Sequence, residues 1–208
     1  MEKGNYLCLL KLLNFESVVL QDGNDMFQIR LDRMAKDLSQ ALEGVGEQVS
    51  CMNIGSWLLL STRSDDEDSL KGLLSALSAY NKQALLFGYP HKGIIFRQKP
   101  AVSNQKGVEV FNSRALIEAK VSLAEQSIAG IVAYEDLCKE KKATLQAYTS
   151  IFEGKQMLKI FRTSLASVAF EEVKKTLKSN FSKVGISENS SEGNSLKMLL
   201  KFMDAENR

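Results

Sequence analysis

The stretch Tyr6-Leu-Cys-Leu-Leu-Lys-Leu-Leu-Asn-Phe15 decides the fold of this chain. It is an apolar run much shorter than the roughly 18 residues that a membrane span needs. Runs of this kind predict a central β-strand that is buried on both faces. Lys11 interrupts the run near its end. Because lysine is almost never buried without a partner, Lys11 must either reach a cleft or be paired with an anion.

The composition is that of an ordinary globular protein, with 44% hydrophobic and 25% charged residues among 208. A net charge of +2 argues against a nucleic-acid partner. The N-terminus lacks the layout of a signal peptide, and no apolar run predicts a membrane span. The three cysteines, Cys8, Cys51 and Cys138, have no metal-binding spacing. We therefore expect a cytoplasmic protein with reduced thiols and no cofactor.

Outward from the first strand, the chain alternates helical and strand patterns. Residues 21–24 read as a turn, after which Asn24 or Asp25 can cap a helix that runs to about residue 42. Two apolar runs, 48–54 and 56–61, are joined at Asn53-Ile-Gly55-Ser56 and predict an antiparallel hairpin.

An acidic run, Arg63-Ser-Asp-Asp-Glu-Asp68, invites interpretation as a metal site. We interpret it instead as a helix start, in which Ser64 and Glu67 form a capping box and the carboxylates complement the helix dipole. The helix that follows ends before Gly88. His91, the only histidine, lies in a Pro-His-Lys turn, where exposed polar surface is the expected role.

The next segments are a strand at 92–97, a polar loop at 98–107, a helix at 111–126 and a strand at 128–133. The resulting order, β-α-β-β-α-β-α-β, predicts an α+β sheet with helices on one face.

The rest of the chain predicts a C-terminal extension. Residues 148–152 and 156–161 read as two strands, and 165–181 as a helix. A Ser/Gly/Asn-rich linker that we expect to be mobile follows, and then a short amphipathic helix. Its apolar face must dock on its own domain or on a partner; that face holds Leu196, Leu199, Leu200 and Met203. The predicted division is 1–138 for the α+β domain, 139–184 for a hairpin and helix that complete or extend it, and 185–208 for the linker and last helix.

The order of elements and four local patterns resemble the catalytic domain of class III nucleotide cyclases, which include adenylate, guanylate and anti-phage pyrimidine cyclases. The family's Asp-x-x-Gly-Phe is matched by Lys11-Leu-Leu-Asn14-Phe15, and its Phe-Ser-Asp-Ser hairpin by Asn53-Ile-Gly55-Ser56. Its Arg-Gly-x-Ile strand is matched by Lys92-Gly-Ile-Ile95, and its following helix by Ala115-Leu-Ile-Glu-Ala119. The resemblance covers residues 5 to about 135. It implies a ferredoxin-like βαββαβ sheet of the cyclase type.

The catalytic positions of the family are not matched. Its two metal-binding carboxylates fall at Lys11 and Gly55, and its transition-state Asn and Arg fall near Ile117 and Val121. Cyclisation needs two divalent metals held by oxygen ligands. The resemblance therefore implies a degenerate cyclase, a pseudoenzyme that acts as a binding or regulatory module without metal or cofactor.

The resemblance also implies a cleft that holds a nucleotide or its phosphates, at Lys11, Asn14, Phe15, Asn53, Gly55 and Lys92. In the family, active sites lie between two head-to-tail subunits, so a homodimer or a heterodimer with a cyclase-like partner is implied. Two alternatives remain open: a structural protein that docks through its C-terminal helix, and an atypical active cyclase. For Lys11 itself, an internal plug of a dead site is favoured over a ligand anchor, because Gly55 supplies no second phosphate contact.

Overall fold

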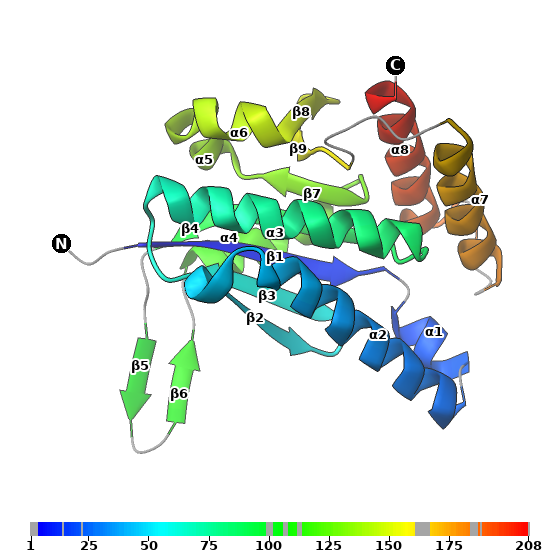
Figure 1. Ribbon diagram of the computed structural model, residues 1–208, viewed down its shortest axis with the longest axis horizontal. Helices are drawn as coiled ribbons and strands as arrows, with labels where there is room; N and C mark the ends of the chain where they lie inside the picture. Colours follow the sequence, from blue (N-terminus) through cyan, green and yellow to red (C-terminus); the bar gives the residue numbers. More distant parts are fainter. Residues whose placement is uncertain are drawn as a thin grey trace.

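A seven-stranded mixed sheet with strand order β2-β3-β1-β4-β7-β9-β8 forms the centre of the protein (Figure 1). The structure is a computed structural model that describes residues 4–13, 15–21, 23–98, 102–105, 108–111, 114–160, 167–183, 187 and 189–207. Only β4 and β7 pair in parallel among these strands. The strands are β1 (Asn5–Leu12), β2 (Val49–Ile54), β3 (Trp57–Thr62), β4 (His91–Gln98), β7 (Gly130–Ala133), β8 (Thr149–Phe152) and β9 (Lys155–Leu158).

Strand β1 is central and buried, as its apolar run predicts. It pairs with β3 on one side and β4 on the other, and Tyr6, Leu7, Cys8 and Leu10 have no exposed surface. The strand ends at Leu12 rather than at Phe15, because Phe15–Gln21 forms the short helix α1. That helix was not predicted, since seven residues carry too little periodicity to be recognised.

Helices cover both faces of the sheet. The α+β class is as predicted, but the expectation of helices on one face holds only for α2 (Asn24–Glu43) and α3 (Glu67–Leu86), which pack against Cys8 and Leu10. Leu7 and Leu9 point to the other face, which is covered by α4 (Arg114–Glu125), α7 (Ser167–Lys183) and α8 (Ser191–Glu206). Alternate side chains of β1 therefore pack into two separate hydrophobic cores, one on each face of the sheet.

Two predicted helix caps are wrong. Helix α2 follows Gly23, and no side chain caps it. The cap of α3 is Asp66, whose carboxylate accepts a hydrogen bond from the Ser69 amide at 2.7 Å. The expected capping box of Ser64 and Glu67 does not form, because Asp66 rather than Ser64 is the N-cap residue; the Ser64 hydroxyl lies 2.5 Å from Asp66 Oδ2 and 2.8 Å from Ser69 Oγ instead. The acidic run is nevertheless a helix start, as predicted.

The expected polar loop at 98–107 contains a strand. There β5 (Val102–Gln105) pairs with β6 (Val108–Phe111) in a separate two-stranded sheet that projects from the body of the protein (Figure 1). Strands of only four residues are too short for a period to stand out, so the sequence did not indicate this hairpin. Three further short helices were also missed: η1 (Gly46–Gln48), α5 (Glu135–Glu140) and α6 (Lys142–Tyr148).

The C-terminal extension folds onto the sheet. Strands β8 and β9 add to its edge, and α8 buries Leu196, Leu199, Phe202 and Met203 in the same core as α4 and α7. The carboxylate of Glu206 accepts hydrogen bonds from the Ile160 amide at 2.9 Å and the Ser150 hydroxyl at 3.0 Å. The last helix therefore docks on its own domain. Of the linker predicted to be mobile, residues 185, 186 and 188 lie outside the described residues.

None of the helices in the described ranges is long and apolar enough to cross a membrane.

Candidate functional site

A row of three side chains crosses the sheet where β1 ends. Lys11 of β1 is paired in register with Trp57 of β3 on one side and with Lys92 of β4 on the other. Side chains alternate along a strand, so Lys11 shares a face with Leu9, Trp57 with Leu59, and Lys92 with Ile94. Those neighbours all belong to the core beneath α4, α7 and α8. The row therefore lies on the face that the C-terminal extension partly covers.

Lys11 is half-buried rather than enclosed. Its Nζ lies 5.6 Å from the centroid of the Trp57 ring, and Lys120 Nζ of α4 lies 5.7 Å from the same ring. Each ammonium group is thus placed for a cation–π interaction, which is worth about 0.5–1 kcal/mol at an exposed site. Trp57 gathers two positive charges at one place. Trp57 is half-buried, so its ring is neither fully enclosed in the core nor fully open for a nucleotide base to stack on it.

Lys92 is 7% exposed, and no hydrogen bond or ion pair joins its ammonium group to another described residue. Burial lowers its pKa, and the neighbouring charges of Lys11 and Lys155 lower it further, whereas Glu192 opposes the shift. A buried cation without a close partner is costly, because it has lost water and gained no compensating bond. An anion at this position would supply that compensation.

The first turn of α8 lies beside Lys92. Ala129, next to the start of β7, donates its amide hydrogen to the carbonyl of Ser195 at 3.1 Å, and Lys92 pairs with Gly130 of the same strand. Helix N-termini carry a partial positive charge. In this helix the Ser190 hydroxyl already accepts a hydrogen bond from the Gly193 amide at 3.0 Å. The negative charge of Glu192 in this first turn opposes the partial positive charge of the helix N-terminus and is the charge of α8 that acts on Lys92.

A carboxylate, Glu16, also lies within electrostatic range of Lys11. It lies in the first turn of α1 and accepts a hydrogen bond from the Ser56 hydroxyl at 2.6 Å. This bond and the nearby charge of Lys11 lower the pKa of Glu16. The short helix α1 brings it back to the hairpin, which a strand running to Phe15 would not have done.

The hairpin residues have structural roles. Asn53 donates from Nδ2 to the carbonyl oxygens of Gly55 at 3.1 Å and Trp57 at 3.2 Å. Gly55 has φ +59°, a left-handed conformation that suits glycine at a tight turn. Both residues are exposed. Their hydrogen bonds and backbone shape hold Trp57 and Ser56 in place.

The six predicted cleft residues are only partly brought together. Lys11 and Lys92 are adjacent, whereas Phe15 lines an apolar pocket with Leu12. Asn14 lies outside the described residues. The site also takes Lys120, Lys155, Glu192 and Glu16, which come from four other elements. Nothing local in the sequence marks these residues.

These groups do not fit a divalent metal ion. Hard cations such as Mg²⁺ require several oxygen ligands. Here the charge of Lys11 acts on Glu16, and the described ranges hold no cluster of three or more His, Cys, Asp or Glu side chains suited to a metal. On α4, Ile117 and Val121 are each 54% exposed, and neither can donate a hydrogen bond.

His91 does not serve as an exposed base. The expectation of exposed surface is wrong, since the side chain has no exposed area and its ring lies 5.6 Å from that of Tyr80. Its Nδ1 is 3.2 Å from the Tyr89 carbonyl oxygen. Burial lowers the pKa of His91 to about 4. A nucleophilic mechanism that relies on this only histidine has no accessible base.

Comparison with known proteins returns solved structures alone, since no family model and no curated protein matches the chain. It resembles the guanylyl cyclase domain of the RhoGC fusion protein from the aquatic fungus Blastocladiella emersonii, with a TM-score of 0.59 and 9% identity, over 74% of this chain and 93% of that one. The fold is that of a class III nucleotide cyclase catalytic domain.

Two further cyclase structures agree with this. The guanylate cyclase domain of RhGC from Catenaria anguillulae, in complex with GTP, has a TM-score of 0.56 and 10% identity, over 74% of this chain and 93% of that one. A bacterial light-regulated adenylyl cyclase has a TM-score of 0.52 and 12% identity, over 84% and 98%. At such identities the likeness shows the cyclase-like fold alone.

Proposed function

We propose that this protein is a catalytically inactive, nucleotide-cyclase-like module that binds a phosphate-bearing ligand through ammonium groups. The observation that carries the proposal is the adjacent pair Lys11 and Lys92 at the end of β1, with Lys120 and Lys155 nearby. Lysine binds phosphate as a compact point charge. In a cyclase-like fold, these ammonium groups take the place of metal ions as the source of positive charge.

The geometry favours Lys11 as a ligand anchor over Lys11 as a plug. A plug would be enclosed, but Lys11 is half-buried. The second phosphate contact that Gly55 could not supply is available from Lys92, whose ammonium group lacks a hydrogen-bond partner among described residues. Glu192, whose negative charge acts on Lys92, lies on the docked helix α8. A bound anion would compete with it.

We expect no cyclase activity. Wild-type protein incubated with ATP, GTP, CTP or UTP and Mn²⁺ should yield no cyclic product, because Lys11 repels cations at one metal position and Gly55 supplies no ligand at the other. Chromatography of the reaction mixtures measures this, with Lys11→Ala as the control for background. Cyclic nucleotide formed by the wild type above that control would contradict the proposal and favour an atypical active cyclase.

We expect the chain to form a homodimer. One similar structure, also from Blastocladiella emersonii, is described as a non-canonical dimeric guanylyl cyclase domain, with a TM-score of 0.56 and 11% identity over 74% of this chain and 93% of that one, whereas the first RhoGC structure above is described as monomeric. The projecting β5–β6 hairpin gives a second reason, since it is paired with no other described strand. Light scattering should return twice the chain mass of 23.1 kDa. A mass near 23.1 kDa at all concentrations would refute this.

The alternative of a structural protein that docks through its C-terminal helix has less support. The apolar face of α8 is already buried against its own sheet at Leu196, Leu199 and Met203. Recruiting a partner through that face would require α8 to leave the core. The lysine site needs no such rearrangement, so ligand binding is the function that the geometry supports best.

A further inference from the structure

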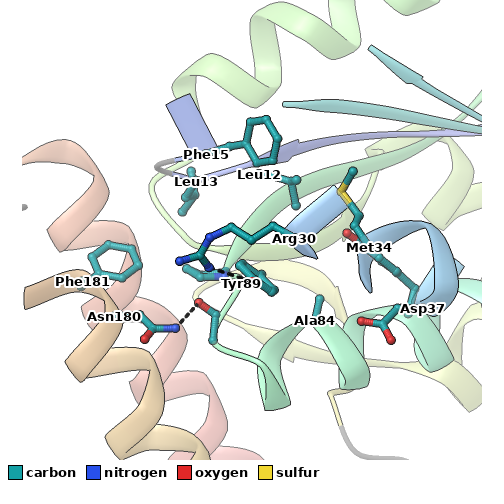
Figure 2. Close-up of a pocket in the computed structure, with 13 residues that line it drawn as sticks. Leu12, Leu13, Phe15, Arg30, Met34, Asp37, Ala84, Tyr89, Asn180 and Phe181 are labelled. Atoms are coloured by element: carbon teal, nitrogen blue, oxygen red, sulfur yellow. Dashed lines mark hydrogen bonds between the residues drawn. The ribbon is translucent and has the colours of Figure 1, made fainter. Parts of the chain in front are cut away.

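An apolar pocket lies on the side of β1 opposite Lys11. Leu12 follows Lys11 in the strand, so its side chain points to the other face of the sheet. The pocket has a volume of about 100 Å³ and lies between the end of β1, helices α2 and α3, and the extension helix α7 (Figure 2). Most of its wall is apolar and comes from Leu12, Leu13, Phe15, Met34, Ala84 and Phe181. The pocket is separate from the lysine site, so its role is independent of the proposed function.

The wall that α7 contributes is held in place by hydrogen bonds. Asn180 Nδ2 donates to the carbonyl oxygens of Phe87 at 3.4 Å and Gly88 at 3.2 Å (Figure 2). These bonds fix α7 against the end of α3. The pocket is therefore formed before a ligand enters, as small-molecule sites usually are.

Tyr80 of α3 brings an unpartnered hydroxyl group to this pocket. The residue lines the pocket and is 2% exposed, and no hydrogen bond joins its hydroxyl to another described residue. The centre of its ring lies 5.6 Å from that of the His91 ring. Burial raises the pKa of Tyr80, so the hydroxyl keeps its proton at neutral pH. A buried O–H group without a partner is costly, and a ligand that accepts its hydrogen bond would remove that cost.

Tyr89 supplies a second hydroxyl group to the pocket. Its oxygen accepts a hydrogen bond from Arg30 Nη1 at 2.9 Å (Figure 2). A phenolic hydroxyl that accepts one bond can still donate its own proton. That proton is given to no acceptor in the part of the chain that the structure describes. Two donors on an otherwise apolar wall favour a ligand that carries an acceptor, such as a carbonyl oxygen.

The charged groups around the pocket already have partners. Arg33 Nε lies 3.2 Å from Oδ1 of the buried Asp37, and the Arg33 guanidinium lies 3.6 Å from the centre of the Phe87 ring. Arg30 bonds Tyr89 and has a further interaction besides. A charged ligand would lose its water here and would have to compete for a counter-charge, which is costly. The electrostatics therefore favour a neutral ligand.

We propose that this pocket binds a small neutral carbonyl compound with a compact apolar body. The apolar walls enclose the body, and the Tyr80 hydroxyl donates to the carbonyl oxygen, with the Tyr89 hydroxyl as a second donor. An engineered apolar cavity of roughly 150 Å³ accepts benzene, so a body of no more than one ring suits this smaller pocket.

Nuclear magnetic resonance of the methionine methyl groups tests this proposal on the full chain. The neutral probe is cyclohexanone, and benzene fills a similar space without an acceptor. Cyclohexanecarboxylate and cyclohexylamine carry the two signs of charge. We expect cyclohexanone to shift the Met34 methyl signal with a millimolar dissociation constant and both charged probes to bind at least tenfold more weakly. The Met52 methyl on exposed strand β2 is the internal control.

Two variants separate the parts of the site. Tyr80→Phe should weaken cyclohexanone at least fivefold and leave benzene unchanged, because it removes the donor and keeps the apolar wall. Unchanged benzene binding also shows that the pocket of this variant is intact. Ala84→Leu should abolish the binding of both probes by filling the pocket. Should Ala84→Leu fail to fold, nuclear Overhauser contacts between cyclohexanone and the Met34 methyl of the wild type locate the ligand directly.

Four results would overturn the proposal. The first is no Met34 shift with cyclohexanone at about 20 mM. The second is a Tyr80→Phe variant in which cyclohexanone and benzene are affected alike. The third is a charged probe that binds as tightly as cyclohexanone, and the fourth is the absence of the Overhauser contacts in the wild type.

Discussion

Lowering the pH from 7.5 to 4 should destabilise the wild-type protein by about 3 kcal/mol through His91 alone. The side chain is fully buried, and burial lowers its pKa to about 4 from an ordinary value of 6.5. The unfolded chain therefore takes up a proton at a pH where the folded protein does not. The stability that neutral His91 contributes is complete above pH 6.5 and is lost as the pH falls toward 4.

The variant His91→Gln isolates this effect, because it removes the titrating group and keeps a polar side chain. We expect its free energy of unfolding, measured by urea titration, to fall by about 3 kcal/mol less than that of the wild type over this pH range. The carboxylates titrate in both proteins, so their contributions cancel in the difference. Parallel pH profiles for the two proteins would show that His91 is protonated in the folded state or is not buried.

Replacing Gly93 by valine should be the most damaging single change beside the site. A Cβ on Gly93 would approach Leu10 Cδ2 and lie 3.0 Å from Ile131 Cγ1. Real Cβ atoms essentially never come as close as this one would to Leu10, and the approach to Ile131 is tighter than nine in ten real contacts, so these side chains of β1 and β7 must shift. Overpacking of this kind costs about 1–3 kcal/mol, and the two further methyl groups of valine place the effect at the upper end.

A matched control is Gly44→Ala. Nothing lies within 4 Å of a Cβ at this position, and its φ is −73°, which any residue adopts. Thermal unfolding should place Gly93→Val well below the wild type and Gly44→Ala within a degree or two of it. An unchanged midpoint for Gly93→Val would mean that β1, β4 and β7 do not pack as closely as described.

Much of the fold could be predicted from the sequence, because the hydrophobic residues of the main helices and strands follow a clear pattern. The apolar run around Leu9 predicts a central strand, and the apolar spacing in residues 24–42 predicts α2, as observed. Short elements such as helix α1 and strand β5 were not predicted, because they have too few residues for a hydrophobic period to be recognised. The placement of helices on the two faces could not be predicted either, since it depends on the connections that carry α4, α7 and α8 to the side of β1 that holds Leu7 and Leu9.

The candidate site was likewise predicted only in part. Lys11 stood out because it interrupts an apolar strand, and Gly55 because a hairpin turn marks it. Lys120, Lys155 and Glu192 are ordinary exposed-type residues in the sequence, and only the fold brings their charges near Trp57 and Lys92. The burial of His91 was missed because a residue at a strand start beside proline looks like a turn.

The central claim is that ammonium groups, without metal, hold a phosphate-bearing ligand at the end of β1. Calorimetric titration with inorganic tripolyphosphate in EDTA tests it most directly, because this probe carries the charge without a base. We expect binding in EDTA at least as tight as in Mg²⁺. Lys92→Met should weaken it at least tenfold, about 1.4 kcal/mol, and Glu192→Gln should tighten it by removing the competing charge. Binding that appears only when Mg²⁺ is present, or that is unchanged in Lys92→Met, would contradict the claim.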